Sequence, residues 1–292
     1  MKIQLQIAQA LLAFTFFLTP VLHAASPADQ APRATVKLLT VGNSFADNST
    51  HFLPALSQAG GKKLTLYRAN LGGHSLQQHV SYIEAFEANP DDPKGSPYMV
   101  NPVTEKGNGI SLREALQSNT WDVVTIQQVS QLAPQYDTYQ PYAGKLIAYI
   151  HQYAPQAQIL VQETWAYPED SPRYSDPKLP YLHNPETMYQ GLKAAYSQLS
   201  VDTGLSLIPV GDAFHTVLTG PHPIRMHGKS ADGKGDIHAN ANGEFLGAAM
   251  FYEMIFRDSV LSNPYVPEGV TPEDAKMLRE VAHETVAKAA KK

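Results

Sequence analysis

Short apolar runs alternate along this chain with longer segments of helical periodicity. The runs at residues 36–41 (VKLLTV) and 123–126 (VVTI) are rich in β-branched and aliphatic side chains, which is typical of strands buried inside a sheet. The segment at residues 142–153 places Leu146, Ile147 and Ile150 at helical spacing. The pattern predicts strands at residues 36–41, 64–69, 121–127, 158–162 and 205–210. It predicts helices at residues 50–59, 76–88, 111–117, 142–153, 186–203, 243–256 and 272–290.

Strands separated by helices indicate a parallel sheet with helices on both faces. The predicted fold is therefore α/β, a flavodoxin-like α/β/α three-layer sandwich with a central five-stranded parallel sheet. No internal repeat is present. Two segments without regular structure, residues 89–109 and 166–184, are unusually long for connections in a compact domain, and such loops are often functional.

The first residues have the features of an export signal. Lys2 is followed by an apolar stretch at residues 8–21 that is too short, and too interrupted by Pro20, for a membrane anchor. Ala24 offers a small residue before a cleavage site. The predicted organisation is a signal peptide at residues 1–24, a flexible lead-in at 25–33 and a single domain at 34–292, and we expect a periplasmic or secreted protein without a membrane partner.

Composition excludes several classes of site. The chain contains no cysteine, so disulfides, thiol catalysis and cysteine-based zinc sites are excluded. The formal net charge is −5 and no lysine or arginine cluster occurs, which argues against nucleic acid as a partner. Of the fifteen tyrosines, many fall in predicted loops. Such rings can stack on a sugar, or they can fill half-buried positions, which is the commoner use of tyrosine.

The first candidate for chemistry is Ser44, in the sequence VGNSFADN. Gly42 and Asn43 suit a tight turn directly after the first predicted strand, because both tolerate unusual backbone angles. The serine hydroxyl would then point out of the carboxyl edge of the sheet, where sites of open α/β folds lie. Ser44 is a candidate nucleophile. The alternative is that Ser44 or Asn48 caps a helix.

The loops after the next strands should reach the same edge of the sheet. Gly72 and Gly73 lie in the loop after the second strand, and their amides are candidate donors to an oxyanion. The side-chain amides at Gln127 and Gln128 follow the third strand. Glu163 and Trp165 follow the fourth strand and are candidates to line a pocket. Each of these residues also has a purely structural interpretation, as a glycine turn, a loop hydrogen bond or a satisfied carboxylate.

A histidine late in the chain completes a possible triad. His238 lies just before a strongly apolar helix, and Asp236 stands two residues earlier, so serine, histidine and aspartate are all available. His222 and His227 lie in the same stretch, but their spacing matches no helical metal-ligand pair, and no metal is predicted. His74 is a candidate to contact substrate.

These blocks together resemble the SGNH (GDSL-like) hydrolase superfamily. The matching positions are the serine block at residues 42–45, the glycine block at 72–73, the block after the third strand and the histidine block at 236–238, and they span residues 36–256. The resemblance implies a flavodoxin-like sandwich, hydrolysis of esters, and neither metal nor cofactor. It also implies that Ser44 is the nucleophile and one oxyanion donor, that the Gly73 amide is a second donor, and that His238 is the base.

Two positions depart from the superfamily pattern. The third block normally presents an asparagine, whereas this chain has glutamines, of which Gln128 is our first choice and Gln131 the alternative for the third oxyanion donor. The histidine block normally has aspartate three residues before the histidine, where this chain has Gly235. Asp236 or Asp232 is then the orienting carboxylate, or the site is a dyad. Residues expected to bind substrate are Asn43, His74, Gln127, Gln131, Glu163 and Trp165.

The resulting hypothesis is an exported serine esterase that removes acyl groups, in the first place acetyl, from a carbohydrate-type or other small ester. Two alternatives belong to other classes. The altered third and histidine blocks are compatible with a non-catalytic glycan-binding module on the same fold. A two-lobed periplasmic receptor would suit the export signal, but five core strands fit one sheet better than two. The sequence does not determine the oligomeric state.

Overall fold

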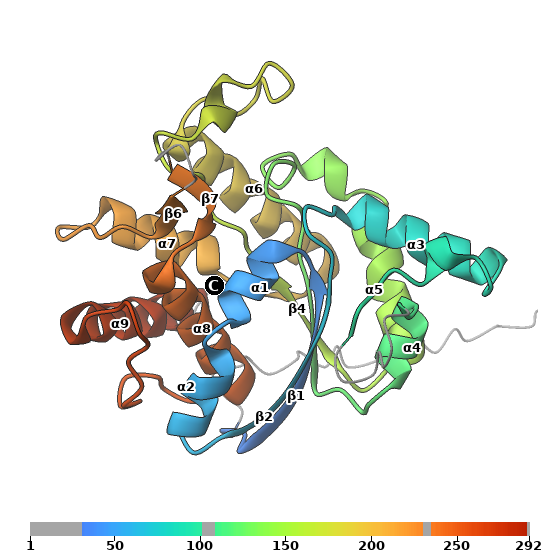
Figure 1. Cartoon of the computed structure of the whole chain (residues 1–292), viewed down its shortest axis with the longest axis horizontal. Helices are drawn as coiled ribbons and strands as arrows, with labels where there is room; N and C mark the ends of the chain where they lie inside the picture. Colours follow the sequence, from blue (N-terminus) through green and yellow to red (C-terminus); the bar gives the residue numbers. More distant parts are fainter. Residues whose placement is uncertain (1–30, 101–108, 230–234, 291–292) are drawn as a thin grey trace, which may run out of the picture.

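The structure is a computed structural model, which describes residues 31–100, 109–229 and 235–290 (Figure 1). The predicted signal peptide at residues 1–24 and most of the predicted lead-in lie outside the described residues. Within the described ranges, none of the helices combines the length and the apolar character needed to cross a bilayer.

A five-stranded parallel sheet forms the centre of the domain. Its strands are β1 (Thr35–Gly42), β2 (Lys63–Asn70), β3 (Val123–Ile126), β4 (Gln158–Gln162) and β5 (Ser206–Ile208). Their order is β2-β1-β3-β4-β5, and every neighbouring pair is parallel. The predicted fold class is confirmed. In the register of the sheet Gly42 pairs with Asn70 and Val41 with Ile126, so β1, β2 and β3 end side by side.

Helices cover both faces of the sheet (Figure 1). One face carries α1 (Ser44–Thr50), α2 (Leu53–Ala59), α7 (Val210–Thr219), α8 (Ala241–Phe256) and α9 (Pro272–Ala289). The other carries α3 (Leu76–Ala88), α4 (Leu112–Gln117) and α5 (Tyr142–Tyr153), and α6 (Pro185–Thr203) leads from β4 to the β5 edge. Short 3-10 helices are η2 (Pro93–Gly95), η3 (Tyr136–Tyr139) and η4 (Pro172–Ser175).

Helix α8 is the core element on the serine side. It is apolar all round, and residues 245–256 are all buried, as expected for a helix enclosed by other elements. Gly247 permits α8 to approach α1 closely, because a Cβ at this position would lie 2.7 Å from Cα and 3.0 Å from Cβ of Ser49. A small residue in α8 thereby sets how α1, which begins at Ser44, lies on the core.

Three parts of the fold differ from the elements expected. The predicted helix at residues 50–59 is two helices, α1 and α2, and α1 begins at Ser44. Helix α7 was expected to be the end of a strand and a loop. An antiparallel hairpin of β6 (His227–Lys229) and β7 (Gly235–Ala239) was not expected, because strands of three and five residues among Gly, Asp and Lys carry no clear alternation.

The tyrosines of the loop at residues 166–184 face inward. Tyr167 is fully buried and its hydroxyl lies 2.9 Å from Ser130 Oγ. The hydroxyl of Tyr174 donates to the Tyr167 carbonyl at 2.8 Å, and that of Tyr181 donates to the Gln131 carbonyl at 2.8 Å. These hydrogen bonds attach the loop to the domain, and the buried ring of Tyr167 is not available to stack on a sugar.

Candidate active site

Ser44 lies at the junction of β1 and α1, and its hydroxyl does not cap the helix. The N-cap of α1 is Asn43, whose Oδ1 accepts the backbone N–H of Phe45 at 3.1 Å. Neither Ser44 nor Asn48 has the capping role that the sequence left open. Ser44 is the first residue of the helix, where a backbone N–H has no acceptor within the helix.

A continuous line of hydrogen bonds joins Ser44, His238 and Asp236. Ser44 Oγ lies 2.9 Å from His238 Nε2, and His238 Nδ1 lies 3.0 Å from Asp236 Oδ1. A carboxylate only accepts, so Nδ1 carries the proton, and Nε2 is left to accept the Ser44 hydroxyl hydrogen. The structure thus brings together the three side chains predicted to form the triad.

Strand geometry explains how an aspartate only two residues from the histidine reaches its ring. Alternate residues of a strand share one face, so Asp236 and His238 of β7 project to the same side. The carboxylate also accepts the backbone N–H of His238 at 3.2 Å. Partial burial tends to raise the pKa of Asp236, but hydrogen bonds from the His238 backbone and ring and the charge of the imidazolium lower it below its ordinary value. Asp236 is therefore ionised at neutral pH, whereas Asp232 lies outside the described residues.

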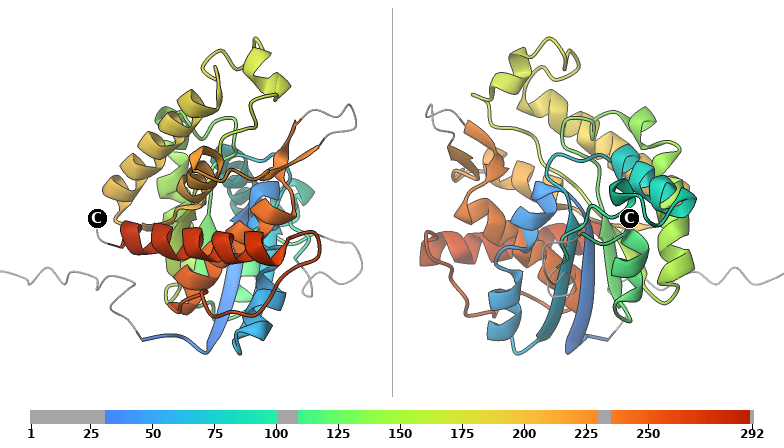
Figure 2. Two further views of the ribbon diagram at one scale, coloured as in Figure 1. Left: turned by 90° about the vertical axis from the view of Figure 1, so that its left-hand side faces the viewer. Right: turned by 45° about the vertical axis from the view of Figure 1, so that its right-hand side comes forward.

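The backbone on both sides of His238 is held by side chains from other elements. Trp165 Nε1–H donates to the carbonyl of Ile237 at 3.1 Å, and Asn48 Oδ1 accepts the N–H of Ala239 at 3.3 Å. In both Figure 1 and Figure 2 the β6–β7 hairpin lies beside the start of α1. The histidine is thus fixed by its chain neighbours as well as by its ring.

A second histidine anchors the hairpin. His227 of β6 pairs with Ala239 of β7, and its Nε2 lies 3.0 Å from the carbonyl oxygen of Ala166. Burial lowers the pKa of His227 to about 4, so the ring is neutral at pH 7 and donates one N–H to that carbonyl. His227 and His238 therefore have separate structural partners, and the described part of the chain contains no group of three or more His, Cys, Asp or Glu placed to hold a metal.

The glycine turn after β2 lies against the serine turn. Leu71 N–H donates to the Gly42 carbonyl at 2.9 Å, and Asn43 Nδ2 donates to the His74 carbonyl at 3.1 Å. Gly73 has a φ of +72°, in the left-handed region that favours glycine. Neither its amide nor that of Ser44 donates to any residue in the described ranges. Two backbone N–H groups are therefore free on neighbouring turns.

A buried histidine holds the backbone of the serine turn by a hydrogen bond from inside the core. His79 of α3 donates from Nε2 to the Gly42 carbonyl at 3.0 Å and accepts the Tyr98 hydroxyl at Nδ1 at 2.8 Å. Complete burial lowers the pKa of His79 to about 4, so the ring is neutral. The sequence interpretation missed this residue. A signal was present, because His79 occupies the core-facing stripe of α3 with Leu76, Val80 and Ile83.

Three of the predicted site residues are instead committed to structure. Asn43 is buried, and its side chain bonds Phe45 N, the His74 carbonyl and Gln127 Nε2, the last at 2.6 Å. The side-chain amide of Gln127 is therefore used in a buried hydrogen bond to Asn43. Gln128, our first choice for the third oxyanion donor, is 1 % exposed and donates from Nε2 to the carbonyl and hydroxyl oxygens of Thr138. Its N–H groups are used there, so it does not supply the expected donor.

Two other residues predicted to contact substrate, His74 and Trp165, have structural partners. His74 places Nδ1 2.8 Å from the Gly72 carbonyl and Nε2 2.9 Å from the Tyr82 hydroxyl, so it shapes the glycine turn. Trp165 is fully buried between Phe45 and Phe214, with ring centroids 4.2 and 4.5 Å away, so its ring belongs to the core.

Gln131 remains as a candidate donor after the third strand. It is half-buried, and its side chain makes no hydrogen bond to any of the described residues. Its backbone carbonyl accepts the Tyr181 hydroxyl, which fixes the turn but leaves the amide available.

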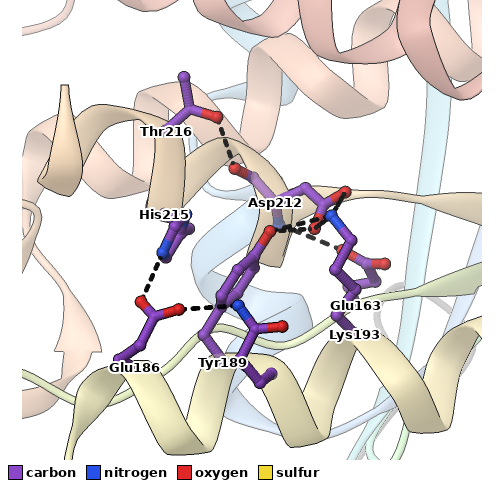
Figure 3. A network of polar contacts seen from close by, with 8 residues as sticks. Glu163, Glu186, Tyr189, Lys193, Asp212, His215 and Thr216 are labelled. Carbon is purple, nitrogen blue, oxygen red and sulfur yellow. Dashed lines mark hydrogen bonds and ion pairs between the residues drawn. The ribbon is translucent and has the colours of Figure 1, made fainter.

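Glu163 belongs to a polar network between α6 and α7 (Figure 3). It is buried, and its Oε2 accepts the backbone N–H of Asp212 at 3.2 Å. The Asp212 carboxylate in turn binds Lys193 Nζ at 3.1 Å and the Tyr189 hydroxyl at 2.8 Å. The network borders a cavity of about 650 Å³ between α6, β5 and α9, which neither Ser44 nor His238 lines. Glu163 therefore stabilises the junction of α6 and α7 and does not line the candidate site.

Comparison with known proteins agrees with the observed architecture. The sequence matches DUF4886, described as a domain of unknown function, over residues 37–285. No curated protein gives a significant match. A DUF4886 family protein from Bacteroides uniformis is 25% identical with a TM-score of 0.71, over 87% of this chain and 95% of that one. A protein from Slackia heliotrinireducens, described as "a putative SGNH hydrolase", is 21% identical with a TM-score of 0.51, over 75% of this chain and 98% of that one. The predicted SGNH-type fold is confirmed.

Proposed function

The chain belongs to the DUF4886 family, whose description assigns no reaction, and we propose that it is a serine ester hydrolase. The observation that carries the proposal is the line of hydrogen bonds from Ser44 Oγ through His238 to Asp236, at 2.9 and 3.0 Å. Nucleophile, base and orienting carboxylate are the three parts of the Ser-His-Asp arrangement that carries out acyl transfer by serine.

In the first half of the reaction the Ser44 oxygen attacks the carbonyl carbon of the ester. His238 Nε2 takes the hydroxyl proton, and Asp236 stabilises the imidazolium. The carbonyl oxygen becomes an oxyanion, for which the amides of Ser44 and Gly73 are the proposed donors. Collapse of the tetrahedral intermediate breaks the bond to the alcohol, which leaves with the proton from His238, and an acyl-serine remains.

In the second half a water molecule replaces the alcohol. His238 takes a proton from the water as the water oxygen attacks the acyl carbon. The second tetrahedral intermediate then collapses, the bond to Ser44 Oγ breaks, Ser44 Oγ takes the proton from His238, and the carboxylic acid is released. One ester and one water become one acid and one alcohol.

For the substrate we propose a short-acyl ester, in the first place an acetyl ester, of a carbohydrate or another small alcohol, acted on outside the cytoplasm. The exposure of the site supports access for the alcohol portion of such an ester, because the side chains of His238 and Asp236 are both 39% exposed. The signal peptide expected at residues 1–24 supports export.

Hydrolysis of p-nitrophenyl acetate by the protein without residues 1–24, compared with Ser44→Ala, tests the reaction. Activity that persists in Ser44→Ala would rule out the mechanism. Labelling by an active-site-directed fluorophosphonate separates the esterase from a glycan-binding module. A labelled wild type and an unlabelled Ser44→Ala support the esterase, whereas sugar affinity without labelling supports the binding module.

A further inference from the structure

One side chain outside the proposed reacting groups connects the two elements that carry them. Asn48 lies one helical turn after Ser44 on α1. Its Oδ1 accepts the backbone N–H of Ala239 at 3.3 Å, and its Nδ2 donates to Glu244 Oε1 at 3.0 Å. Ala239 directly follows His238 in β7. One side-chain amide therefore adds a second connection between the helix that begins at the serine and the strand that carries the histidine.

The orientation of this amide is determined by its two partners. A backbone N–H only donates and a carboxylate only accepts, so the oxygen of Asn48 must face Ala239 and the nitrogen must face Glu244. Glu244 projects from the first turn of α8 and is half-buried. Exchange of the amide oxygen and nitrogen would break both hydrogen bonds, so the geometry of Asn48 is fixed.

The edge of β7 that faces away from β6 faces α1 at Ala239. The N–H of Asn240 donates toward β6, to the Met226 carbonyl at 3.0 Å. The N–H of Ala239 points the other way and meets Asn48. The side chain of Asn48 thus accepts the backbone hydrogen bond that a neighbouring strand would otherwise accept, at the residue next to His238.

We infer that Asn48 is a positioning residue that holds His238 at hydrogen-bond distance from Ser44. Two contacts separated by one helical turn, Ser44 with His238 and Asn48 with Ala239, define how β7 lies against α1. Without the second contact the Ala239 side of His238 loses its hydrogen bond to α1, while Trp165 still holds the Ile237 side. The role in catalysis rests on the proposed esterase function, whereas the positioning of the ring is a property of the structure.

The test compares Asn48→Ala, Asn48→Asp and the double variant Asn48→Asp with Glu244→Gln. Misplacement of reacting groups by about 1 Å costs on the order of 100-fold in rate, so in Asn48→Ala we expect kcat and fluorophosphonate labelling of Ser44 to fall by that order with KM little changed. Asn48→Asp sets two carboxylates against each other and should be at least as slow. The double variant restores the pair with donor and acceptor exchanged, and should recover most of the rate.

Thr271→Ala is the stability-matched control, because it removes the N-cap of the remote helix α9 and costs about 1 kcal/mol. It should lower the melting temperature with kcat unchanged. If Asn48→Ala and Thr271→Ala slow the reaction equally, or if the double variant recovers nothing, the inference is overturned.

Nitrogen NMR of labelled histidine decides the inference independently of activity. In the wild type His238 should show one tautomer, with the proton on Nδ1 facing Asp236. Asn48→Ala should broaden these signals or mix the tautomers, and unchanged signals would overturn the inference. A wild type that neither labels nor hydrolyses esters overturns the proposed function instead, while the NMR comparison still stands.

Discussion

His79 donates a hydrogen bond to the carbonyl oxygen of Gly42, two residues before Ser44, at 3.0 Å from inside the core. The ring is held from its other side by the Tyr98 hydroxyl, and both side chains are fully buried. A residue on α3 and a residue of the long loop at 89–109 therefore determine the position of the backbone from which the serine projects.

The loss of unfolding free energy on removing both His79 and Tyr98 should be smaller than the sum of the two single losses. His79→Phe leaves the Tyr98 hydroxyl buried without a partner, and Tyr98→Phe leaves His79 Nδ1 without one, so each should destabilise the protein by about 1–3 kcal/mol. In the double variant neither member of the pair leaves the other unsatisfied, and the Gly42 carbonyl keeps the N–H of Leu71, so the total should be smaller than the sum. Urea unfolding of the four proteins measures this coupling. Strictly additive losses would show that the two side chains do not act as a unit.

Stability should fall as the pH is lowered through the range below neutrality. Burial lowers the pKa of both His79 and His227 to about 4, whereas the unfolded chain binds these protons near the ordinary value of 6.5. Between those values the unfolded state holds more protons, so acidification favours unfolding, by up to about 3 kcal/mol for each histidine.

Unfolding free energies measured between pH 7 and pH 4 check this prediction. His227→Gln keeps an N–H donor for the Ala166 carbonyl and removes the titration, so its stability should depend less steeply on pH. Parallel curves for the variant and the wild type would exclude His227 as a source of the acid sensitivity.

Asp236→Asn should impair turnover without preventing folding. Asparagine can retain a contact with the ring, but it lacks the charge that stabilises the imidazolium and fixes the Nδ1 proton. We expect kcat for p-nitrophenyl acetate to fall by about 10²- to 10⁴-fold with little change in KM. Asp137→Asn, at an exposed position of η3, is the charge-matched control. Equal activities of Asp236→Asn and this control would mean that Ser44 and His238 work as a dyad.

Gly247→Ala should disturb the packing of α1, the helix that begins at Ser44, against α8. The new methyl group would lie 2.7 Å from Ser49 Cα, so α1 or α8 must shift, and overpacking of this kind costs about 1–3 kcal/mol. Gly144→Ala is the matched control, because Gly144 lies exposed in α5 with no atom within 4 Å of the new methyl group. That change should stabilise the protein by about 0.5–1 kcal/mol. Thermal unfolding distinguishes the two, and a stabilising Gly247→Ala would contradict the close packing of α1 on α8.

The sheet, and the edge of it at which Ser44 lies, could be predicted because their signals are local. Buried parallel strands are short apolar runs, and the residues after them must meet at one edge whatever the loops do. This rule alone predicts that Ser44 lies near the glycine turn. The strand-to-helix junction also limits the possible caps to few residues, although the cap proved to be Asn43.

The roles of the amides could not be predicted, because a glutamine reaches several atoms whose positions depend on tertiary contacts. Gln128 bonds Thr138, ten residues along a turn whose path the sequence does not specify. The hairpin was missed for a related reason, since β6 and β7 are stabilised by contacts such as His227 with Ala166 and not by an alternating pattern.

The short spacing of Asp236 and His238 has a consequence for how the candidate triad is assembled. Ser44 and His238 are 194 residues apart in the chain, but Asp236 and His238 are only two apart and share one strand. Once β7 is extended, the pair exists as a local unit, and a single long-range closure completes the site. The entropic cost of bringing distant segments together is then met once for three side chains.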